Sequence, residues 1–357
     1  MTNDEHVPKH VEDLASIPTA ESGLFTAYGS LRSVRSGRTS QNKRYVDLEI
    51  SDQSASLGAK IWDDSAAAQD AALSIPSGRC VKLLFQPGSY QGVLQLTIKG
   101  IREVSDDDDG VFRPAAIYGE GIDLVEDLLC ETLVFDIETV PVQDKRELPS
   151  TVAETLVKFA DYKEMETSAV MGMSPFFGKV VSLAFGEGES DLSDQHVTAL
   201  VVPPEGTDVD AFPDWMRPMT EADLLRAFWV LAGAASNVVT YNGRGFDVPF
   251  LINRSLIHKI PARVDLLSNR YSLRPHLDLL QILKHGAYGS GPTTLDVVCW
   301  SLGIESPKGE MDGSMVAPAY GRGEIEEIAR YNLADVRATT EVYQHVRDGL
   351  LRYRKDW

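Results

Sequence analysis

The chain has 357 residues, of which 43 % are hydrophobic and 24 % charged, and its formal net charge at pH 7 is −19. This length and composition are typical of a globular protein with two ordinary domains, or with one domain and a large appendage. No stretch is long and apolar enough for a membrane span. The negative charge does not exclude nucleic-acid binding, because enzymes that use metal ions gather carboxylates.

Residues 1–22 mix acidic, basic and polar side chains without the apolar core of a signal peptide, so they are predicted to form a disordered tail. From residue 23 to 103, short runs with period-two alternation are separated by turn residues. The predicted strands are Leu24–Val34, Val46–Ile50, Leu57–Trp62, Cys80–Phe85 and Leu94–Ile98. With a helix over Asp64–Leu73 between the third and fourth strands, this order predicts an OB-fold, a small all-β barrel.

An acidic run at Asp106–Asp109 follows the predicted barrel. We predict an acidic inter-domain linker over 104–129. The alternative is an acidic surface loop within one domain, and it is less favoured because the pattern of secondary structure changes across this segment.

Residues 130–357 show a mixed α/β pattern. The predicted strands are Thr132–Ile137, Lys179–Phe185, Val197–Val202 and Val238–Tyr241. A capping box at Thr220–Asp223 predicts a helix to about Ala235, and two further helices are predicted over Val248–His258 and from about Glu324 to Arg352.

Two acids lie on the first strand of this second domain, at Asp136 and Glu138. Period two places both side chains on one face, where burial of two carboxylates is costly unless a cation neutralises them. Taken alone, the pair could equally be two solvated acids at the end of a strand.

Two further acids follow the same logic. Asp247 ends the segment Tyr241–Asp247 between a strand and a helix, where an ordinary N-cap aspartate is equally expected. Tyr331 and Asp335 are four residues apart on the last helix and therefore share a face. Each motif alone has an ordinary structural explanation, and it is their joint order along the chain that is specific.

With these motifs, residues 130–350 resemble the DEDD exonuclease superfamily, in the subtype that has a tyrosine in its third motif. The segments Phe135–Pro141, Asn242–Phe250 and Tyr331–Asp335 are similar to the three motifs of the bacterial branch related to the exonuclease domain of family-B DNA polymerases. The resemblance implies a ribonuclease H-like domain over 130–357, with a mixed sheet flanked by helices.

The resemblance also implies the chemistry. Two Mg²⁺ or Mn²⁺ ions about 3.5–4 Å apart would be held by the acids, one to activate water and one to stabilise the leaving oxygen. The implied metal ligands, which are also catalytic, are Asp136, Glu138, Asp247 and Asp335. By the same resemblance, Tyr331 would orient the attacking water. Its reference pKa of about 10 makes it a poor base, so the metal is expected to do most of the deprotonation.

Three other polar residues lie in or near these motifs. Arg244 could contact a phosphate, although a surface arginine is equally plausible. His276 lies outside the third motif, where Tyr331 already fills the position, so it is predicted to be a packing histidine. Asp278 is expected to be a supporting or capping acid and not a ligand.

The barrel resembles the OB-fold domain of some bacterial 3′–5′ exoribonucleases, through Tyr45–Leu48, Ala59–Asp63 and Leu94–Lys99. Candidate nucleic-acid-binding residues are basic side chains around the first hairpin and aromatic side chains for base stacking. They are Arg35, Arg38, Lys43, Arg44, Lys60, Trp62 and Tyr90. The alternative is that Trp62 caps the barrel and the charges form a solvated face.

The predicted function is a metal-dependent 3′–5′ exonuclease that releases nucleoside 5′-monophosphates from single-stranded DNA or RNA with a free 3′ end. The catalytic resemblance favours DNA and the barrel resemblance favours RNA. The alternatives are a catalytically inactive nucleic-acid-binding protein with a nuclease fold, or an endonuclease. The odd number of cysteines, all far apart, predicts a cytoplasmic location without structural zinc.

Overall fold

The computed structural model of the chain describes residues 7–19, 21–76, 78–90, 92–142, 145–190, 197–267, 272–284, 291–307 and 311–354. The chain divides into two compact units, one of residues 1–131 with 233–236, and one of residues 132–232 with 237–357. In the described ranges, no helix has both the length and the apolar character needed to cross a membrane.

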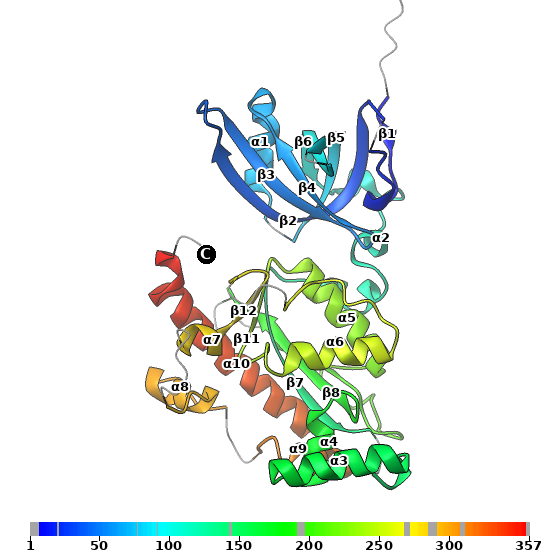
Figure 1. Cartoon of the computed structure of the whole chain (residues 1–357), viewed down its shortest axis with the longest axis vertical. Coiled ribbons are helices and arrows are strands. Elements are labelled where there is room, and N and C mark those ends of the chain that lie inside the picture. Colours follow the sequence, from blue (N-terminus) through cyan, green and yellow to red (C-terminus); the bar gives the residue numbers. More distant parts are fainter. Residues whose placement is uncertain are drawn as a thin grey trace, which may run out of the picture. The chain divides into compact units, whose positions relative to one another are not determined.

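The first unit contains a closed five-stranded barrel (Figure 1). Its strands are β2 (Phe25–Arg38), β3 (Arg44–Ser51), β4 (Ser56–Ile61), β5 (Cys80–Tyr90) and β6 (Val93–Glu103). The order β2-β3-β4-β6-β5 closes through β2–β5 pairing, and β4–β6 is the parallel pair within this ring. Helix α1 (Ala66–Ser74) connects β4 to β5. The predicted OB-fold is therefore confirmed, with its single helix in the expected place.

The alternation along β3 and β4 explains why the barrel forms. Val46, Leu48 and Ile50 point into the core, as do Ala59 and Ile61 on the neighbouring strand. The residues between them face outward, so one register defines both the interior and an outer face over β2, β3 and β4.

Residues expected to form a disordered tail are partly ordered. Strand β1 (Lys9–His10) pairs in parallel with β2, and the short helix η1 (Leu14–Ser16) follows it. Leu14 and Ile17 are buried in the barrel core. The prediction of disorder was wrong for residues 9–17, because three buried apolar side chains spaced among polar ones, those of Val11, Leu14 and Ile17, anchor this short segment. Residues 1–6 and 20 lie outside the described part.

The segment expected to be an acidic linker also packs on the barrel. Asp108 is buried and accepts hydrogen bonds from the Tyr28 hydroxyl at 2.9 Å, from Lys82 at 3.0 Å and from Arg102 at 2.7 and 2.8 Å. Helix α2 (Pro114–Tyr118) follows. One member of the acidic run is thus a structural ion-pair partner, and the segment up to α2 is part of the first unit.

The second unit is built on a six-stranded mixed sheet of order β10-β9-β8-β7-β11-β12. Its strands are β7 (Thr132–Pro141), β8 (Gly178–Glu187), β9 (Val197–Val201), β10 (Met216–Pro218), β11 (Asn237–Thr240) and β12 (His276–Asp278). Strand β8 is antiparallel to β7 and to β9, whereas β7, β11 and β12 run parallel. This is the predicted ribonuclease H-like arrangement.

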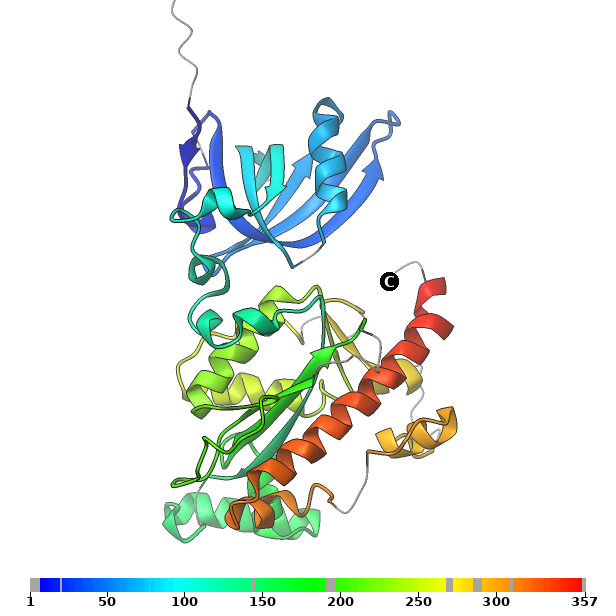
Figure 2. The same ribbon diagram turned by 180° about the vertical axis from the view of Figure 1, so that it is seen from behind.

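Helices cover both faces of this sheet. They are α3 (Ser150–Lys163), α4 (Thr167–Met173), α5 (Glu221–Ala234), α6 (Asp247–Ile257), α7 (Leu279–Lys284), α8 (Leu295–Leu302), α9 (Val316–Gly321) and α10 (Ile325–Gly349). Figure 1 shows α5 and α6 on one face, and Figure 2 shows α10 crossing the other. The remaining short 3₁₀ helices are η2 (Asp63–Ser65), η3 (Asp106–Asp108), η4 (Ile122–Leu124), η5 (Glu126–Leu128), η6 (Lys145–Glu147) and η7 (Leu351–Tyr353).

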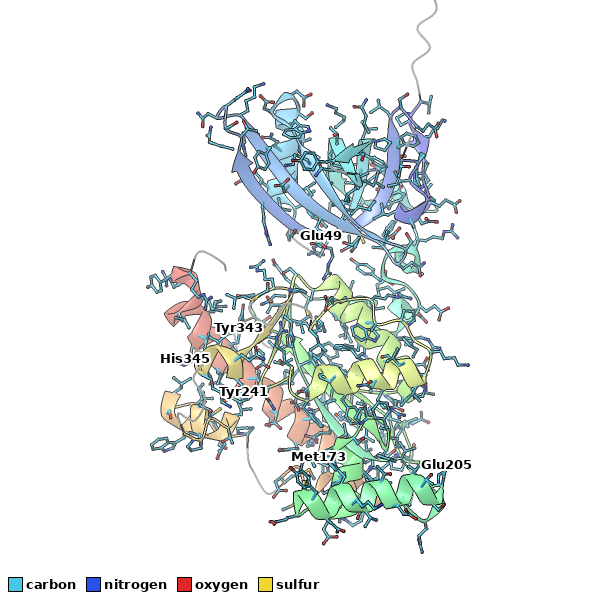
Figure 3. All side chains as sticks on the ribbon, in the orientation of Figure 1. Glu49, Met173, Glu205, Tyr241, Tyr343 and His345 are labelled. Atoms are coloured by element: carbon cyan, nitrogen blue, oxygen red, sulfur yellow. The ribbon has the colours of Figure 1, made fainter. Side chains whose placement is uncertain are left out.

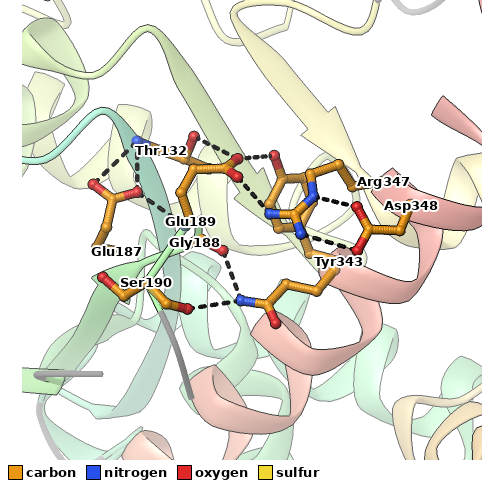
Figure 4. A network of polar contacts seen from close by, with 9 residues as sticks. Thr132, Glu187, Gly188, Glu189, Ser190, Tyr343, Arg347 and Asp348 are labelled. Atoms are coloured by element: carbon orange, nitrogen blue, oxygen red, sulfur yellow. Dashed lines mark hydrogen bonds and ion pairs between the residues drawn. The ribbon is translucent and has the colours of Figure 1, made fainter. Parts of the chain in front are cut away.

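A polar network holds the C-terminal half of α10 near the end of β8. Glu189 accepts a hydrogen bond from the hydroxyl of Tyr343, which Figure 3 labels, and pairs with Arg347 (Figure 4). Gln344 donates to the carbonyl of Gly188 at 3.0 Å. These contacts, with the apolar core beneath, fix the rotation of α10 about its axis and thereby the residues that it turns toward β7.

Candidate active site

Strand β7 directs two acids toward α10. Phe135 packs on Phe228 of α5, with ring centroids 4.9 Å apart, so the neighbouring residues Asp136 and Glu138 point to the opposite face. Both acids are only partly exposed. The predicted period-two pair is therefore present, and it faces the last helix.

Helix α10 brings the third acid. Tyr331 and Asp335 lie one turn apart on it, and carboxylate oxygens of Asp136, Glu138 and Asp335 all lie within 4.8 Å of one another. Residues distant in sequence thus form one group of acids that could hold a metal ion.

Asp247 is the first residue of α6 and adds the fourth acid at the edge of this group. It is buried, and its Oδ1 accepts a hydrogen bond from the Ile137 backbone N–H at 3.3 Å. Ile137 lies between the two acids of β7, so this bond places Asp247 beside that strand. Asp247 is not one of the three whose oxygens cluster within 4.8 Å.

The turn before Asp247 depends on close backbone approach. A Cβ on Gly243 would lie 2.3 Å from Oγ1 of Thr240, and one on Gly245 would lie 2.6 Å from Oδ1 of Asn242. Asn242 itself has a left-handed φ of 65°. The two glycines and the asparagine therefore allow the chain to turn tightly from β11 into α6.

Burial and mutual repulsion dominate the electrostatics of the group. Burial raises the pKa of Asp136 well above its usual range, and the charges of Asp247 and Asp335 raise it further. The pKa of Glu138 is raised for the same reasons, first by burial and then by Asp335 and Asp247. Such a group is costly without a counter-charge, which a divalent cation supplies.

Tyr331 borders these acids. Burial raises the pKa of its hydroxyl above the usual range, and the charges of Asp335 and Glu138 add to the effect. The hydroxyl therefore keeps its proton at neutral pH and can position a water molecule, but cannot act as a base.

Asp278 organises the turn that leads to Asp247. Its carboxylate accepts hydrogen bonds from the backbone N–H groups of Asn242 at 3.0 Å and of Arg244 at 3.1 Å. The guanidinium of Arg244 donates to the carbonyls of Leu267 at 3.1 Å and His276 at 3.2 Å. These bonds give Arg244 a structural role in the turn, and the phosphate contact expected from the sequence stays a prediction.

His276 is a packing histidine, as predicted. Its ring nitrogens lie 2.9 Å from the Leu266 carbonyl and 2.8 Å from Oγ1 of Thr240, and the side chain is fully buried. Burial lowers its pKa to about 4, so the ring is neutral at physiological pH.

Asn332 is a residue of the site to which the sequence alone assigned no role. It follows Tyr331 on α10, is fully buried, and donates from Nδ2 to Oδ2 of Asp136 at 2.6 Å. The only signal in the sequence was a polar amide on the apolar stripe of the last helix.

On the outer face of the barrel, a cluster is formed by Lys60, Tyr45 and Trp62. The Lys60 ammonium lies 4.2 Å from the ring centroid of Tyr45 and 5.0 Å from that of Trp62, and it pairs with Asp47 at 2.9 Å. Tyr90 is 64 % exposed, at the end of β5. The sequence pattern indicated Tyr45 only as a strand residue.

The remaining basic candidates belong to β2, β3 and the loop between them. Arg35 and Arg38 lie on β2 and are exposed. Lys43 pairs with Asp63 at 3.3 Å, and Arg44 pairs with Asp70 at 3.2 Å. The outer face of β3 and β4 thus carries the Lys60 cluster, and Arg35 of β2 lies beside it, opposite Asp47. Arg38 and Arg44 lie opposite each other at the ends of β2 and β3. OB-folds take up oligonucleotides through such a face and its adjoining loops.

The second unit thus combines the mixed sheet and flanking helices expected from the sequence with a group of acids that could hold a metal ion. Residues 196–352 match the family described as "Predicted 3′-5′ exonuclease related to the exonuclease domain of PolB", which confirms the resemblance drawn from the motifs. The match includes Asp247, Tyr331 and Asp335, and it begins after β7. No curated protein matches the chain.

Solved structures similar to this chain include the family B DNA polymerase from the hyperthermophilic archaeon Pyrobaculum calidifontis. The two are 15 % identical, the match covers 90 % of this chain and 46 % of that chain, and the TM-score is 0.42. The chain therefore spans less than half of that polymerase. The second OB-fold domain of replication protein A from Methanococcus maripaludis shows 11 % identity over 28 % of this chain and 97 % of its own, with a TM-score of 0.22. Rim1, a mitochondrial single-stranded DNA binding protein from S. cerevisiae, shows 15 % identity over 24 % and 98 %, with a TM-score of 0.21.

Proposed function

We propose that this chain is a metal-dependent 3′–5′ exonuclease that hydrolyses single-stranded DNA or RNA from a free 3′ end and releases nucleoside 5′-monophosphates. The observation that carries the proposal is the convergence of Asp136, Glu138 and Asp335, with Asp247 beside them, in a domain of this family. Buried carboxylates that raise one another's pKa have little structural use, whereas they suit a site for cations.

Hard oxygen ligands of this kind fit Mg²⁺ or Mn²⁺, and the four acids would hold two ions. When bound, the ions activate the attacking water and stabilise the leaving oxygen. Tyr331 keeps its proton and orients that water through its hydroxyl. The acids themselves hold charge in fixed positions and transfer no proton.

The assay that tests this proposal follows hydrolysis of a single strand labelled at either end, with Mn²⁺ present. We expect single nucleotides from the 3′ end. Asp136→Ala and Asp247→Ala should each lower turnover by more than about 100-fold, because even supporting partners of metal ligands are worth about 10- to 100-fold. Asp161→Ala, an exposed acid on α3, is the matched control and should keep wild-type activity.

Residual activity in both acid variants would contradict the four-carboxylate site. Absence of turnover in the wild type, with binding retained, would favour the inactive nucleic-acid-binding alternative. Cleavage of circular strands would identify an endonuclease.

We further propose that the barrel binds the single strand through its outer face. Tyr45, Trp62 and Tyr90 would stack bases, and the basic candidates Arg35, Arg38, Lys43, Arg44 and Lys60 would meet the backbone. Alanine at Trp62 or Tyr90 should raise KM for a long strand and leave kcat unchanged, while Leu73→Ala on α1 serves as an exposed control on the same barrel. An unchanged KM in both aromatic variants would remove the barrel from substrate binding.

The sugar of the substrate is assigned by comparing matched DNA and RNA strands, since only contacts to the 2′-OH separate them. We propose a cytoplasmic location, because three cysteines far apart in the sequence are typical of a protein from a reducing compartment.

A further inference from the structure

A buried chain of polar contacts runs from β8 through α10 to the first acid of the site. Ser182 donates from its hydroxyl to Oδ1 of Asn332 at 2.8 Å, and Nδ2 of Asn332 donates to Oδ2 of Asp136 at 2.6 Å. Ser182 and Asn332 are both fully buried. Ser182 also lies opposite Glu138 in the β7–β8 register, so the chain crosses the face that carries the acids.

Packing alone does not account for an amide at this position. Ile328, Ala329, Leu333 and Val336, on the turns around Asn332, are buried apolar residues. An aliphatic side chain would continue that surface without the cost of desolvating an amide. The amide is therefore best explained by its contact with Asp136.

The two hydrogen bonds of Asn332 define which way its amide points. With the opposite orientation, Oδ1 of Asn332 would face a carboxylate oxygen, and two acceptors would repel each other. Ser182 reinforces the observed orientation because its hydroxyl donates to Oδ1. One oxygen of Asp136 is thereby fixed in direction, and the carboxylate cannot rotate freely.

We propose that Asn332 is a positioning residue for the metal site. It holds Asp136 in the orientation that presents its other oxygen to a cation, and Ser182 locks the amide that does so. This inference rests on the proposed function. It adds Asn332 and Ser182 to the site, and neither residue is one of the predicted metal ligands.

The test compares Mn²⁺ affinity, measured by calorimetry on the full chain without nucleic acid, in variants of this contact. Asn332→Leu removes both hydrogen bonds at similar volume, and we expect Mn²⁺ affinity to fall by about 10- to 100-fold, the usual effect of losing a partner of a metal ligand. The rate kcat at low Mn²⁺ should fall with it, while KM for the strand stays near the wild-type value. Ser182→Ala keeps the amide but frees its rotation, and should cause a smaller loss of affinity.

Thr340→Val is the matched control. Thr340 is also buried on α10, and its hydroxyl donates to the Val336 carbonyl at 2.8 Å. This variant should lower the melting temperature without changing Mn²⁺ affinity, so it separates a loss of helix packing from a loss of metal positioning.

Asn332→Asp provides a second signature. A carboxylate placed against Asp136 should lower the melting temperature of the metal-free protein. Saturating Mn²⁺ should then raise the melting temperature of this variant by more than it raises that of the wild type. A purely structural role for Asn332 would give a loss that Mn²⁺ does not restore.

Wild-type Mn²⁺ affinity in a folded Asn332→Leu protein overturns the inference. If that variant does not fold, Ser182→Ala is tested in its place, and an unchanged Mn²⁺ affinity in this variant likewise overturns the inference. A wild type that binds Mn²⁺ but hydrolyses no strand contradicts the proposed function and leaves the affinity comparison valid. A wild type that binds no Mn²⁺ overturns both.

Discussion

Burial raises the pKa of Asp247 to about 7, and the charges of Asp278 and Asp335 contribute to the rise. In the unfolded chain the same carboxyl has a pKa of about 3.9. The folded protein therefore binds a proton at this residue over a pH range in which the unfolded chain has already lost it. Asp136 and Glu138 shift in the same direction, so the three acids act together.

The sign of the resulting pH dependence follows from linkage. A raised folded pKa gives stability that is fully present below the unfolded pKa and is lost as the pH rises through the folded value. We expect the melting temperature of the metal-free protein to fall between about pH 5 and about pH 8, and saturating Mn²⁺ to reduce or reverse this fall. Asp247→Asn should weaken the dependence. A melting temperature that is flat over this range without metal would contradict the assignment of these acids as an uncompensated group.

At the scale of elements, a buried ion pair joins the helix that precedes β11 to the helix that carries Asp247. Glu221, at the start of α5, accepts hydrogen bonds from Arg254 of α6 at 2.8 and 2.6 Å and from the Val180 backbone N–H of β8 at 3.0 Å. His258 lies 2.9 Å from the same carboxylate. The side chains of the Glu221–Arg254 pair are less than one tenth exposed, so neither charge is well solvated.

Glu221→Gln is expected to destabilise the second unit by about 3–5 kcal/mol, because it leaves the buried Arg254 charge without its partner. Urea unfolding followed by circular dichroism measures the loss. The double variant Glu221→Leu with Arg254→Met is the control and should lose less than the single variant, since it removes both charges. If the single variant unfolds at the wild-type urea concentration, the pair does not hold α5 to α6.

Much of the element order could be predicted from the sequence. Alternation in the barrel strands and in β7 follows directly from one buried face, and the capping box at Thr220 marks the start of α5, where its hydroxyl accepts from the Asp223 N–H at 3.1 Å. The helices α3 and α4 and the short strands β10 and β12 were not predicted. Three-residue strands carry too little periodicity to be recognised alone, and tertiary pairing decides them.

Some residues of the candidate site could likewise be predicted from the sequence, and others could not. Acids that belong to spaced motifs could be named from the sequence, because the motif order restricts where they meet. The roles of Asn332 and Tyr45 could not, since each depends on which side chain from another element lies opposite. Asp108 shows the same limit, because its structural ion pairs cannot be distinguished from a solvated acidic run in the sequence.

At the scale of the whole molecule, the chain is acidic, with a net charge of −19. Acidic side chains also lie beside the cations of the proposed binding face of the barrel. Three of its cations are paired with aspartates: Lys43 with Asp63, Arg44 with Asp70 and Lys60 with Asp47. A phosphate must therefore compete with a carboxylate at each of these positions. Binding there would depend more on stacking than on charge.

We expect single-strand affinity to depend only weakly on salt. These three paired cations, if engaged by a strand, would contribute about −2.1 to the slope of log K against log salt, at about −0.7 for each, and their measured contribution should be smaller. Fluorescence anisotropy without divalent ions measures it. Asp47→Asn should tighten binding and steepen the slope by releasing Lys60, whereas Asp161→Asn on α3 should change neither. A wild-type slope at or beyond the full value would show that the aspartates do not compete.

The metal site takes its acids from β7, from the start of α6 and from α10, so no short segment of the chain contains it. Closing such long loops is slow, and the site is complete only when the sheet and its last helix have docked. Bound Mn²⁺ should accordingly slow unfolding and leave the refolding rate almost unchanged, as expected for contacts absent from the transition state. Stopped-flow denaturant jumps with and without Mn²⁺ test this. Cation occupancy would then determine how long the folded protein survives proteolysis, independently of how fast it folds.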